Sequence, residues 1–253
     1  MKVRLLKILD ATAGFFLCWT AGWWLHIRRR NIPGGAPVPA EVRRILVIRP
    51  GGLGDMVLLQ PMLLRLRQQF PAAAIDLVCE RRNQDIPAMA GHGARVLPYD
   101  ARPFQLVREL RRNPYDIAVD TEQFHYFSAI MALLSGAPVR IGFKINPGRN
   151  TIYTHLVNYD LEGYEAGEFM RLLAPLGIKE AAGLPMRWTG LSEHGQLMNG
   201  TSLSPDAARR SASTSPYIVI HIGTGSRYKR WGTENFASLV KQLSSLSPLP
   251  SAL

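Results

Sequence analysis

The chain has 253 residues, more than one typical domain needs and few for two full α/β domains. Its apolar share of 47% excludes an intrinsically disordered protein, and its two cysteines, Cys18 and Cys79, form neither a disulfide framework nor a paired metal site. The net charge of +11 lies mostly in residues 1–50, which contain nine Lys and Arg but two acidic residues. Because these basic residues flank aromatic ones and no nucleic-acid motif is present, they favour a membrane surface and indicate no nucleic-acid partner.

Residues 11–27 read ATAGFFLCWTAGWWLHI, an uncharged run between three basic residues and the arginine triplet 28–30. As a helix this run is about 26 Å long, slightly short of the roughly 30 Å hydrocarbon core of a bilayer. Its tryptophans suit the headgroup level, and arginines stand where a signal peptide needs small residues. We expect residues 1–30 to be an in-plane or shallow membrane anchor, with a helix buried on the protein body as the alternative. The Pro- and Gly-rich residues 31–41 predict a linker.

From residue 42 the chain alternates short apolar strands with helices. The predicted strands are Arg44–Arg49, Ile75–Cys79, Arg95–Pro98, Asp116–Asp120 and Val139–Gly142. The predicted helices are Asp55–Phe70, Asn83–Met89, Pro103–Arg112, Phe124–Leu134 and Glu165–Leu176. This alternation predicts a doubly wound parallel sheet, a Rossmann-like domain over residues 42–200. A strand at Tyr217–His221 and a helix at Thr233–Leu246 predict the start of a second domain over residues 201–253.

A glycine-rich loop, PGGLGD at residues 50–55, joins the first strand to the first helix. Ligands of doubly wound sheets bind beyond the carboxyl ends of the strands, and glycines let a substrate approach the backbone closely. Asp55 lies at the end of this loop, at the mouth of the expected ligand crevice. Its carboxylate could cap the helix, or it could be a general base that takes the proton from an acceptor hydroxyl.

A dinucleotide site is a third interpretation of the same loop. Gly52 and Gly54 match the first two glycines of G-x-G-x-x-G, and Glu80 ends the second strand where a ribose-binding acid belongs. However, Val57 replaces the third glycine, and Asp55 would repel a pyrophosphate at the start of the helix. A nicotinamide-dependent oxidoreductase therefore ranks behind the other interpretations.

Four segments in register, residues 45–71, 115–124, 137–143 and 217–243, resemble glycosyltransferase family 9, the heptosyltransferases of lipopolysaccharide core assembly. The resemblance implies a GT-B fold of two facing Rossmann-like domains, the first binding mainly the acceptor and the second mainly a nucleotide sugar. It also implies an inverting transfer that needs no cofactor or metal. The expected donor is ADP-heptose, and the expected acceptor is lipopolysaccharide core or a related lipid-linked glycan at the inner face of the plasma membrane.

The resemblance assigns the catalytic base to Asp55 and the acceptor-side loop to Gly51, Gly52 and Gly54. Asp120, at the end of a neighbouring strand, is expected to contact the acceptor. The donor-phosphate segment of the family matches residues 221–231, where the expected contacts to the diphosphate are Thr224, Gly225, Ser226 and Lys229. Their structural alternative is a solvated basic turn at a helix entry.

The second domain of the family continues beyond the residues present here and supplies the contacts to the nucleotide base and ribose. We therefore expect this chain to bind a nucleotide sugar weakly. The alternative function is that of a truncated, catalytically inactive fragment whose first domain binds an acceptor or a partner.

Overall fold

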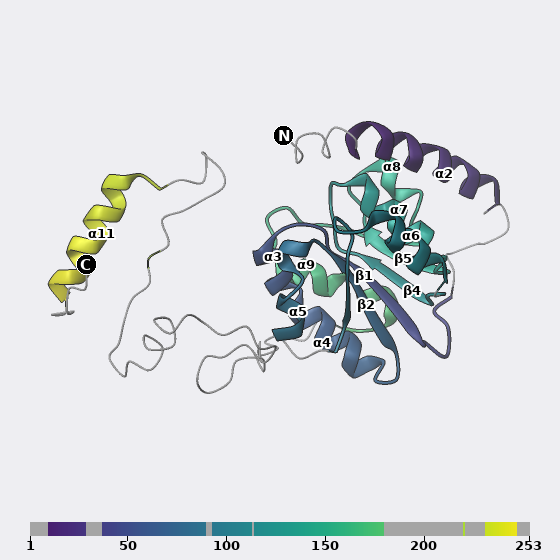
Figure 1. The fold of residues 1–253 in the computed structure, drawn as a ribbon, viewed down its shortest axis with the longest axis horizontal. Coiled ribbons are helices and arrows are strands. Elements are labelled where there is room, and N and C mark those ends of the chain that lie inside the picture. The colour runs from purple at the N-terminus through teal and green to yellow at the C-terminus, as the bar shows by residue number, and fades with distance from the viewer. Residues whose placement is uncertain are drawn as a thin grey trace. The chain divides into compact units, whose positions relative to one another are not determined.

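The computed structural model describes residues 10–28, 37–89, 93–112, 114–179, 220 and 231–246. The described residues belong to two units, one that ends at residue 179 and one that contains helix α11 (Thr233–Leu246). The first unit is a parallel sheet with helices packed on it (Figure 1). The α/β fold class predicted from the sequence is confirmed, whereas the predicted domain boundaries stay a prediction.

One sheet of six parallel strands has the order β3-β2-β1-β4-β5-β6. The strands are β1 (Arg44–Ile48), β2 (Ala74–Cys79), β3 (Arg95–Pro98), β4 (Ile117–Asp120), β5 (Val139–Phe143) and β6 (His155–Val157). β1 lies in the middle between β2 and β4, so the chain winds outward from it in both directions. In such sheets the ligand crevice forms beyond the carboxyl ends of the central strands.

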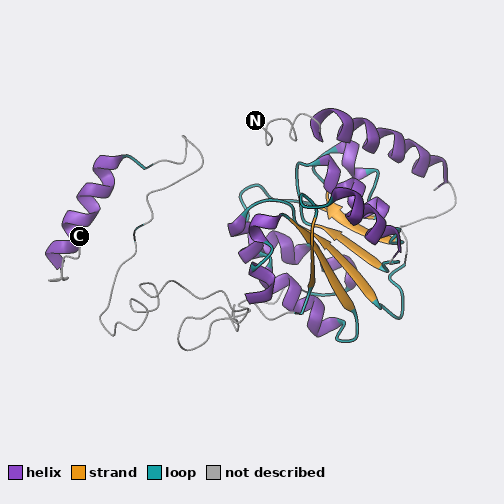
Figure 2. Cartoon of the chain, in the orientation of Figure 1, coloured by secondary structure: helices purple, strands orange, loops and turns teal. Residues whose placement is uncertain are grey.

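Helices cover both faces of the sheet (Figure 2). One face carries α3 (Leu53–Leu58), α4 (Gln60–Gln69), α9 (Glu165–Arg171) and the 3₁₀ turn η4 (Ala174–Leu176). The other face carries α6 (Pro103–Arg112), α7 (Tyr126–Leu134) and the short α8 (Pro147–Asn150). A 3₁₀ turn, η3 (Arg81–Asn83), and α5 (Ile86–Met89) follow β2.

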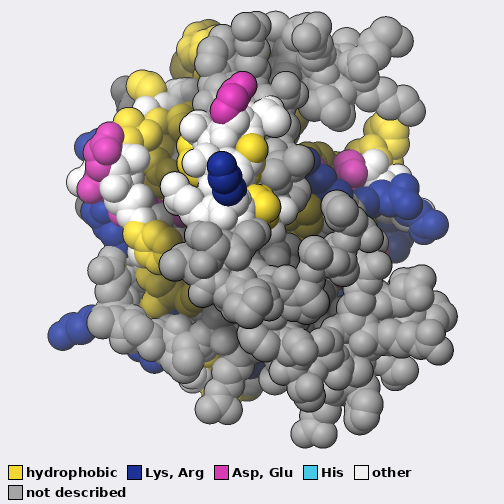
Figure 3. Space-filling view, turned by 90° about the vertical axis from the view of Figure 1, so that its left-hand side faces the viewer, with side chains coloured by type: hydrophobic (Ala, Val, Ile, Leu, Met, Phe, Trp, Pro, Cys, Tyr) yellow, Lys and Arg dark blue, Asp and Glu magenta, His cyan; other side chains and the backbone are white. Residues whose placement is uncertain are grey.

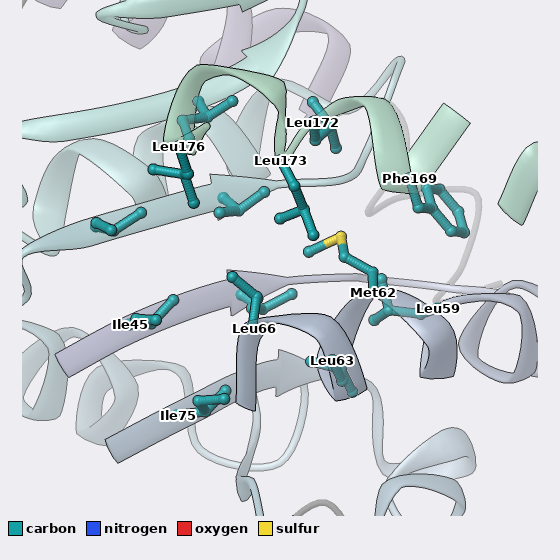
Figure 4. Packing of buried hydrophobic residues seen from close by; sticks show 14 of the residues in the cluster. Ile45, Leu59, Met62, Leu63, Leu66, Ile75, Phe169, Leu172, Leu173 and Leu176 are labelled. Atoms are coloured by element: carbon teal, nitrogen blue, oxygen red, sulfur yellow. The ribbon is translucent and has the colours of Figure 1, made fainter. Parts of the chain in front are cut away.

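The side chains of β1 alternate between two apolar clusters, one on each face of the sheet. Ile45 and Val47 belong to the first cluster, and Leu46 and Ile48 belong to the second. Figure 4 shows the first cluster, in which leucines of α4 and of the α9–η4 segment pack toward Ile45 and Ile75. Because both faces are covered, every position of this strand after Arg44 is apolar and buried.

Two of the predicted helices are each divided in two. The stretch Asp55–Phe70 forms α3 and α4, which are separated at Leu59; Pro61, in the first turn of α4, has no N–H for a helical hydrogen bond. Glu165–Leu176 likewise divides into α9 and η4, and Pro175 lies in the first turn of η4. β6 and α8 were not predicted, because a three-residue strand and a four-residue helix are too short to show their periods.

The N-terminal apolar segment forms a π-helical turn, η1 (Asp10–Gly14), followed by α2 (Phe15–Arg28). η1 and α2 pack against α7 and α8 within the same unit, and the side turned toward these helices contains the buried residues Gly14, Cys18 and Gly22. The other side of α2 is exposed. The packing agrees with the alternative of a helix docked on the protein body, and the membrane anchor stays a prediction. Within the described residues, no helix has the length and apolar character needed to cross a membrane.

The predicted helix at Thr233–Leu246 is confirmed as α11. Just before it, the ring of Trp231 meets that of Phe236 edge to face, with centroids 4.9 Å apart. Trp231 and Val240 are about half exposed. Figure 3 shows one face of the molecule, on which hydrophobic side chains reach the surface between charged ones. Of the predicted strand Tyr217–His221, only Ile220 is among the described residues.

Candidate active site

A cavity of about 830 Å³ lies at the carboxyl edge of the sheet, where the fold predicts the ligand crevice. The loops after β1, β2 and β4 contribute to its walls, together with η1 and α9. The ionisable residues that line it are Asp10, Arg49, Asp55, Glu80, Arg82, Asp100, Glu122, His125 and Glu165. Six of these are carboxylates, which accept hydrogen bonds from hydroxyl groups and repel phosphates.

The loop after β1 depends on two glycines with positive φ. Gly51 has φ +91° and its carbonyl accepts a hydrogen bond of 2.5 Å from the side-chain amide of Asn83. Gly52 has φ +24°, and a Cβ added there would lie 2.1 Å from a carboxylate oxygen of Asp55. The loop therefore wraps closely around this carboxylate. Gly54 differs, because a Cβ at its position would meet nothing within 4 Å.

The side chain of Asp55 does not act as a helix cap. The N-cap residue of α3 is Gly52, which has no side chain to cap the helix, and Asp55 lies in the first turn of α3. Its Oδ2 instead accepts a hydrogen bond of 2.6 Å from Nη2 of Arg49. The Asp55 side chain is 40% exposed and lines the cavity, so its carboxylate is accessible to a substrate.

Arg49 follows β1 directly and is 5% exposed. Its Nη1 donates to the carbonyl of Thr121 at 2.8 Å, and its guanidinium lies 5.0 Å from the centre of the Phe169 ring. Arg49 thus connects the loops after β1 and β4 and fixes the Asp55 carboxylate between them. Arg49 was not predicted as a site residue, although a charged residue at the end of a buried apolar strand and beside a glycine-rich loop is a visible signal.

Asp120, expected to contact an acceptor, is fully buried at the end of β4. Its Oδ2 accepts hydrogen bonds from Nη2 of Arg149 at 2.9 Å and from the hydroxyl of Tyr153 at 2.5 Å. It is not among the residues that line the cavity; Glu122 and Gln123, which follow it, are. The Asp120 carboxylate is therefore shielded from the cavity by its own hydrogen-bond network.

Arg149 is the centre of this buried network and comes from α8. It donates to the carbonyl of Glu122 at 2.7 Å and also to the carbonyl of Gln123. Burial opposes its charge, but the neighbouring Tyr153 and Asp120 raise the pKa of Arg149 above its ordinary value. The network fixes the backbone of the loop after β4. No local signal in the sequence connects Asp120 with a residue 29 positions later.

Asp10 of η1 closes another wall of the cavity. Its carboxylate accepts hydrogen bonds from the backbone N–H groups of Tyr126 at 3.1 Å and Phe127 at 2.8 Å, in the first turn of α7. Burial would raise the pKa of Asp10, but hydrogen bonds from His125 and from these amides outweigh it and lower the pKa below its ordinary value. Asp10 thereby caps a helix from 116 residues away, a contact that the sequence does not reveal.

The structure therefore places Asp55, Gly51 and Gly52 in the wall of one cavity, with Gly54 next to Asp55 and Asp120 enclosed behind it. The predicted donor-phosphate contacts Thr224, Gly225, Ser226 and Lys229 lie outside the described residues.

Comparison with known proteins gives a match to a family model. Residues 104–246 match the model of glycosyltransferase family 9 (heptosyltransferase). The chain is 30% identical over 206 residues to lipopolysaccharide heptosyltransferase 3 of Escherichia coli, an alignment that covers 75% of this chain and 57% of that protein. The chain thus spans little more than half the length of this relative.

Two solved structures share the fold. The family 9 glycosyltransferase of Veillonella parvula has a TM-score of 0.64 at 19% identity, over 84% of this chain and 62% of that one. The E. coli heptosyltransferase WaaC with ADP has a TM-score of 0.57 at 18% identity, over 81% of this chain and 64% of that one. These likenesses support the GT-B type of the predicted α/β fold.

Proposed function

Because the chain belongs to glycosyltransferase family 9, the heptosyltransferase family, we propose that it transfers a heptose from ADP-heptose to a hydroxyl of lipopolysaccharide core or a related lipid-linked glycan. The names of its relatives support this choice, since one is a lipopolysaccharide heptosyltransferase and another was solved with ADP. The acceptor would bring the protein to the cytoplasmic face of the membrane, with no metal or cofactor required.

The proposed reaction uses the Asp55 carboxylate as the general base. Asp55 takes the proton of the acceptor hydroxyl while that oxygen forms a bond to the anomeric carbon of the donor. The bond from this carbon to the diphosphate breaks, and the diphosphate leaves with the electron pair. Attack from the opposite side inverts the configuration at the anomeric carbon. We assign Thr224, Gly225, Ser226 and Lys229 to the departing diphosphate, which needs donors and positive charge.

The hydrogen bond between Arg49 and Asp55 is the observation that carries this proposal. It fixes one carboxylate oxygen of a side chain that is 40% exposed in the cavity. Among the described residues, no other hydrogen bond to this carboxylate is present, which leaves it able to accept one from a substrate hydroxyl. The six carboxylates of the cavity also suit the hydroxyls of an acceptor sugar better than a diphosphate.

The test compares Asp55→Asn with the unchanged chain in a transfer assay that contains ADP-heptose and a core acceptor. Asparagine keeps the shape and the hydrogen bond to Arg49 but cannot take a proton, so we expect a loss of about 10²- to 10⁴-fold in kcat. Acceptor binding, measured by calorimetric titration, should persist. The control is Asp85→Asn, which removes an exposed carboxylate that does not line the cavity.

Two results would count against the proposal. Normal turnover by Asp55→Asn would reject the base assignment. Acceptor binding without turnover by the unchanged chain would favour the alternative function, an acceptor-binding domain without catalysis.

A further inference from the structure

We propose that η1 and α2 form a docked membrane-facing surface: the aromatic side of α2 enters the headgroup layer of an anionic bilayer while the opposite side stays on α7 and α8. The proposed function places the acceptor on a lipid, and this inference names the surface that meets that lipid. It rests on the proposed function only for the identity of the acceptor.

The docked side of the segment is built for close packing. Gly14, Cys18 and Gly22 recur every four residues and are all buried. A Cβ added at Gly22 would lie 2.2 Å from Oγ1 of Thr151, and one added at Gly14 would lie 2.8 Å from Cβ of Tyr126. α2 therefore approaches α7 and α8 at a distance that only small residues permit, unlike a helix that is connected to the domain only by a flexible linker.

The opposite side of α2 exposes large aromatic residues. Phe16 is 61% exposed, Trp19 is 58% exposed and Trp23 is 63% exposed. Residues 16, 19 and 23 follow helical spacing, so these rings share one side of the helix. Tryptophan is the residue type that concentrates at the membrane–water interface. A row of such rings costs free energy in water and gains it in a headgroup layer.

The charges around α2 identify an anionic lipid surface as its partner. In sequence the segment lies between Lys2, Arg4 and Lys7 on one side and the arginines 28–30 on the other. Basic residues that flank an interfacial helix are attracted to the negative surface potential of an anionic leaflet. A second copy of this strongly basic chain would instead bring like charges together.

The docked position also relates the membrane to the active site. Asp10 begins the segment, caps α7 and lines the cavity that contains Asp55. If the segment stays docked, the cavity wall and the membrane-facing helix form parts of one body. A lipid-linked sugar could then reach Asp55 while its lipid remains in the bilayer.

The first test measures binding of the full chain to vesicles of phosphatidylcholine, with and without phosphatidylglycerol. We expect binding to the anionic vesicles and a loss on the order of 10-fold or more in Trp19→Ser/Trp23→Ser. The matched control is Phe104→Ser, because Phe104 is a 90% exposed aromatic residue on α6. Equal binding by the double variant would overturn the proposal, as would self-association of the unchanged chain without vesicle binding.

The second test asks whether α2 stays docked on the bilayer, and it uses Cys18 as the reporter. In a Cys79→Ala background, Cys18 is the remaining thiol; it is fully buried, and burial raises the pKa of this thiol to about 12. We expect slow maleimide labelling both in solution and on anionic vesicles. Rapid labelling on vesicles alone would show that the helix leaves the body, which would overturn the docked arrangement.

Gly22→Leu provides the positive control, since its side chain would collide with Thr151 and should expose Cys18. Ala13→Leu adds the same side chain at an exposed position of η1 and should leave Cys18 protected. Neither test needs sugar transfer, so failure of the proposed catalytic function and failure of this inference are distinguishable.

Discussion

Two Arg–Asp pairs at the carboxyl edge of the sheet have opposite surroundings. Asp120 and Arg149 are both fully buried, and every oxygen of the carboxylate is used within the fold. Asp55 also pairs with a buried arginine, Arg49, but its own side chain is 40% exposed in the cavity. The closed pair, Asp120 and Arg149, fixes the backbone of the loop after β4. The open pair, Asp55 and Arg49, presents a carboxylate to the cavity. An aspartate at the carboxyl edge of the sheet is therefore informative about chemistry only when its exposure is known.

The largest loss of stability should follow from breaking the closed pair. Asp120→Ala leaves the buried charge of Arg149 without its partner, which typically costs about 3–5 kcal/mol. We expect a clear fall in the denaturant midpoint, or failure to fold. Replacing both partners, as Asp120→Leu/Arg149→Met, should recover part of this loss. A double variant as unstable as Asp120→Ala would contradict the view that the unpaired charge is the main cost.

The open pair should tolerate change better. Arg49→Met removes the donor to the buried carbonyl of Thr121, which should cost about 1–3 kcal/mol. Asp55→Ala removes a partly exposed partner, while Arg49 keeps the carbonyl of Thr121 and the carboxylate of Glu122 at 4.0 Å. It should therefore cost about 1 kcal/mol or less. Urea unfolding of the two variants measures this difference. If Asp55→Ala were as destabilising as Asp120→Ala, the two pairs would not differ as their exposures indicate.

The glycines beside the open pair should respond in opposite directions. Gly52→Ala forces a side chain into positive φ and against the Asp55 carboxylate, and a strained position of this kind costs about 1–3 kcal/mol. Gly54→Ala adds a methyl group in open space within α3 and should stabilise the chain by about 0.5–1 kcal/mol. Thermal melts of both variants provide the comparison. A fall in transfer rate for Gly54→Ala without loss of stability would indicate that a substrate uses this space.

The smallest effect is the change of stability with pH in acid that another buried carboxylate, Asp76 of β2, produces. Burial would raise its pKa, but hydrogen bonds from Arg95 and Tyr115 outweigh burial and hold the pKa of Asp76 below the ordinary value of 3.8. Its stabilising contribution is therefore complete above pH 3.8 and is lost as the pH falls through the lowered pKa. Asp76→Asn should be less stable at neutral pH and should show a shallower decline in acid. If the stability of Asp76→Asn declined in acid as steeply as that of the unchanged chain, this assignment would be wrong.

Strands and long helices could be predicted because their residues show a local pattern. β3 and α6 were predicted with the bounds that the structure has, and the other predicted strands that it describes differ by one residue at an end. The division at Leu59 was less evident, since the apolar spacing continues through it although Pro61 marks the place. β6 contains three residues and has no periodic signal.

The site was predictable only in part. The glycines and Asp55 are adjacent in the sequence, so the cavity mouth could be located from a single motif. The direction of the Asp55 side chain depends on Arg49, and the enclosure of Asp120 depends on Arg149. Such long-range contacts have no local pattern, which is why Asp120 was expected in the cavity and Asp10 was not considered.

The cap that Asp10 provides for α7 has a consequence for the synthesis of the chain. Asp10 is translated 116 residues before Tyr126, and ribosomes add about 5–20 residues per second, an interval on the order of 10 s. Throughout that time the apolar segment at residues 11–27 has left the peptidyl-transferase centre while its docking helices have not been made. A nascent chain translated near a bilayer can therefore meet lipid before it meets its own folded body, so membrane contact and folding compete in time.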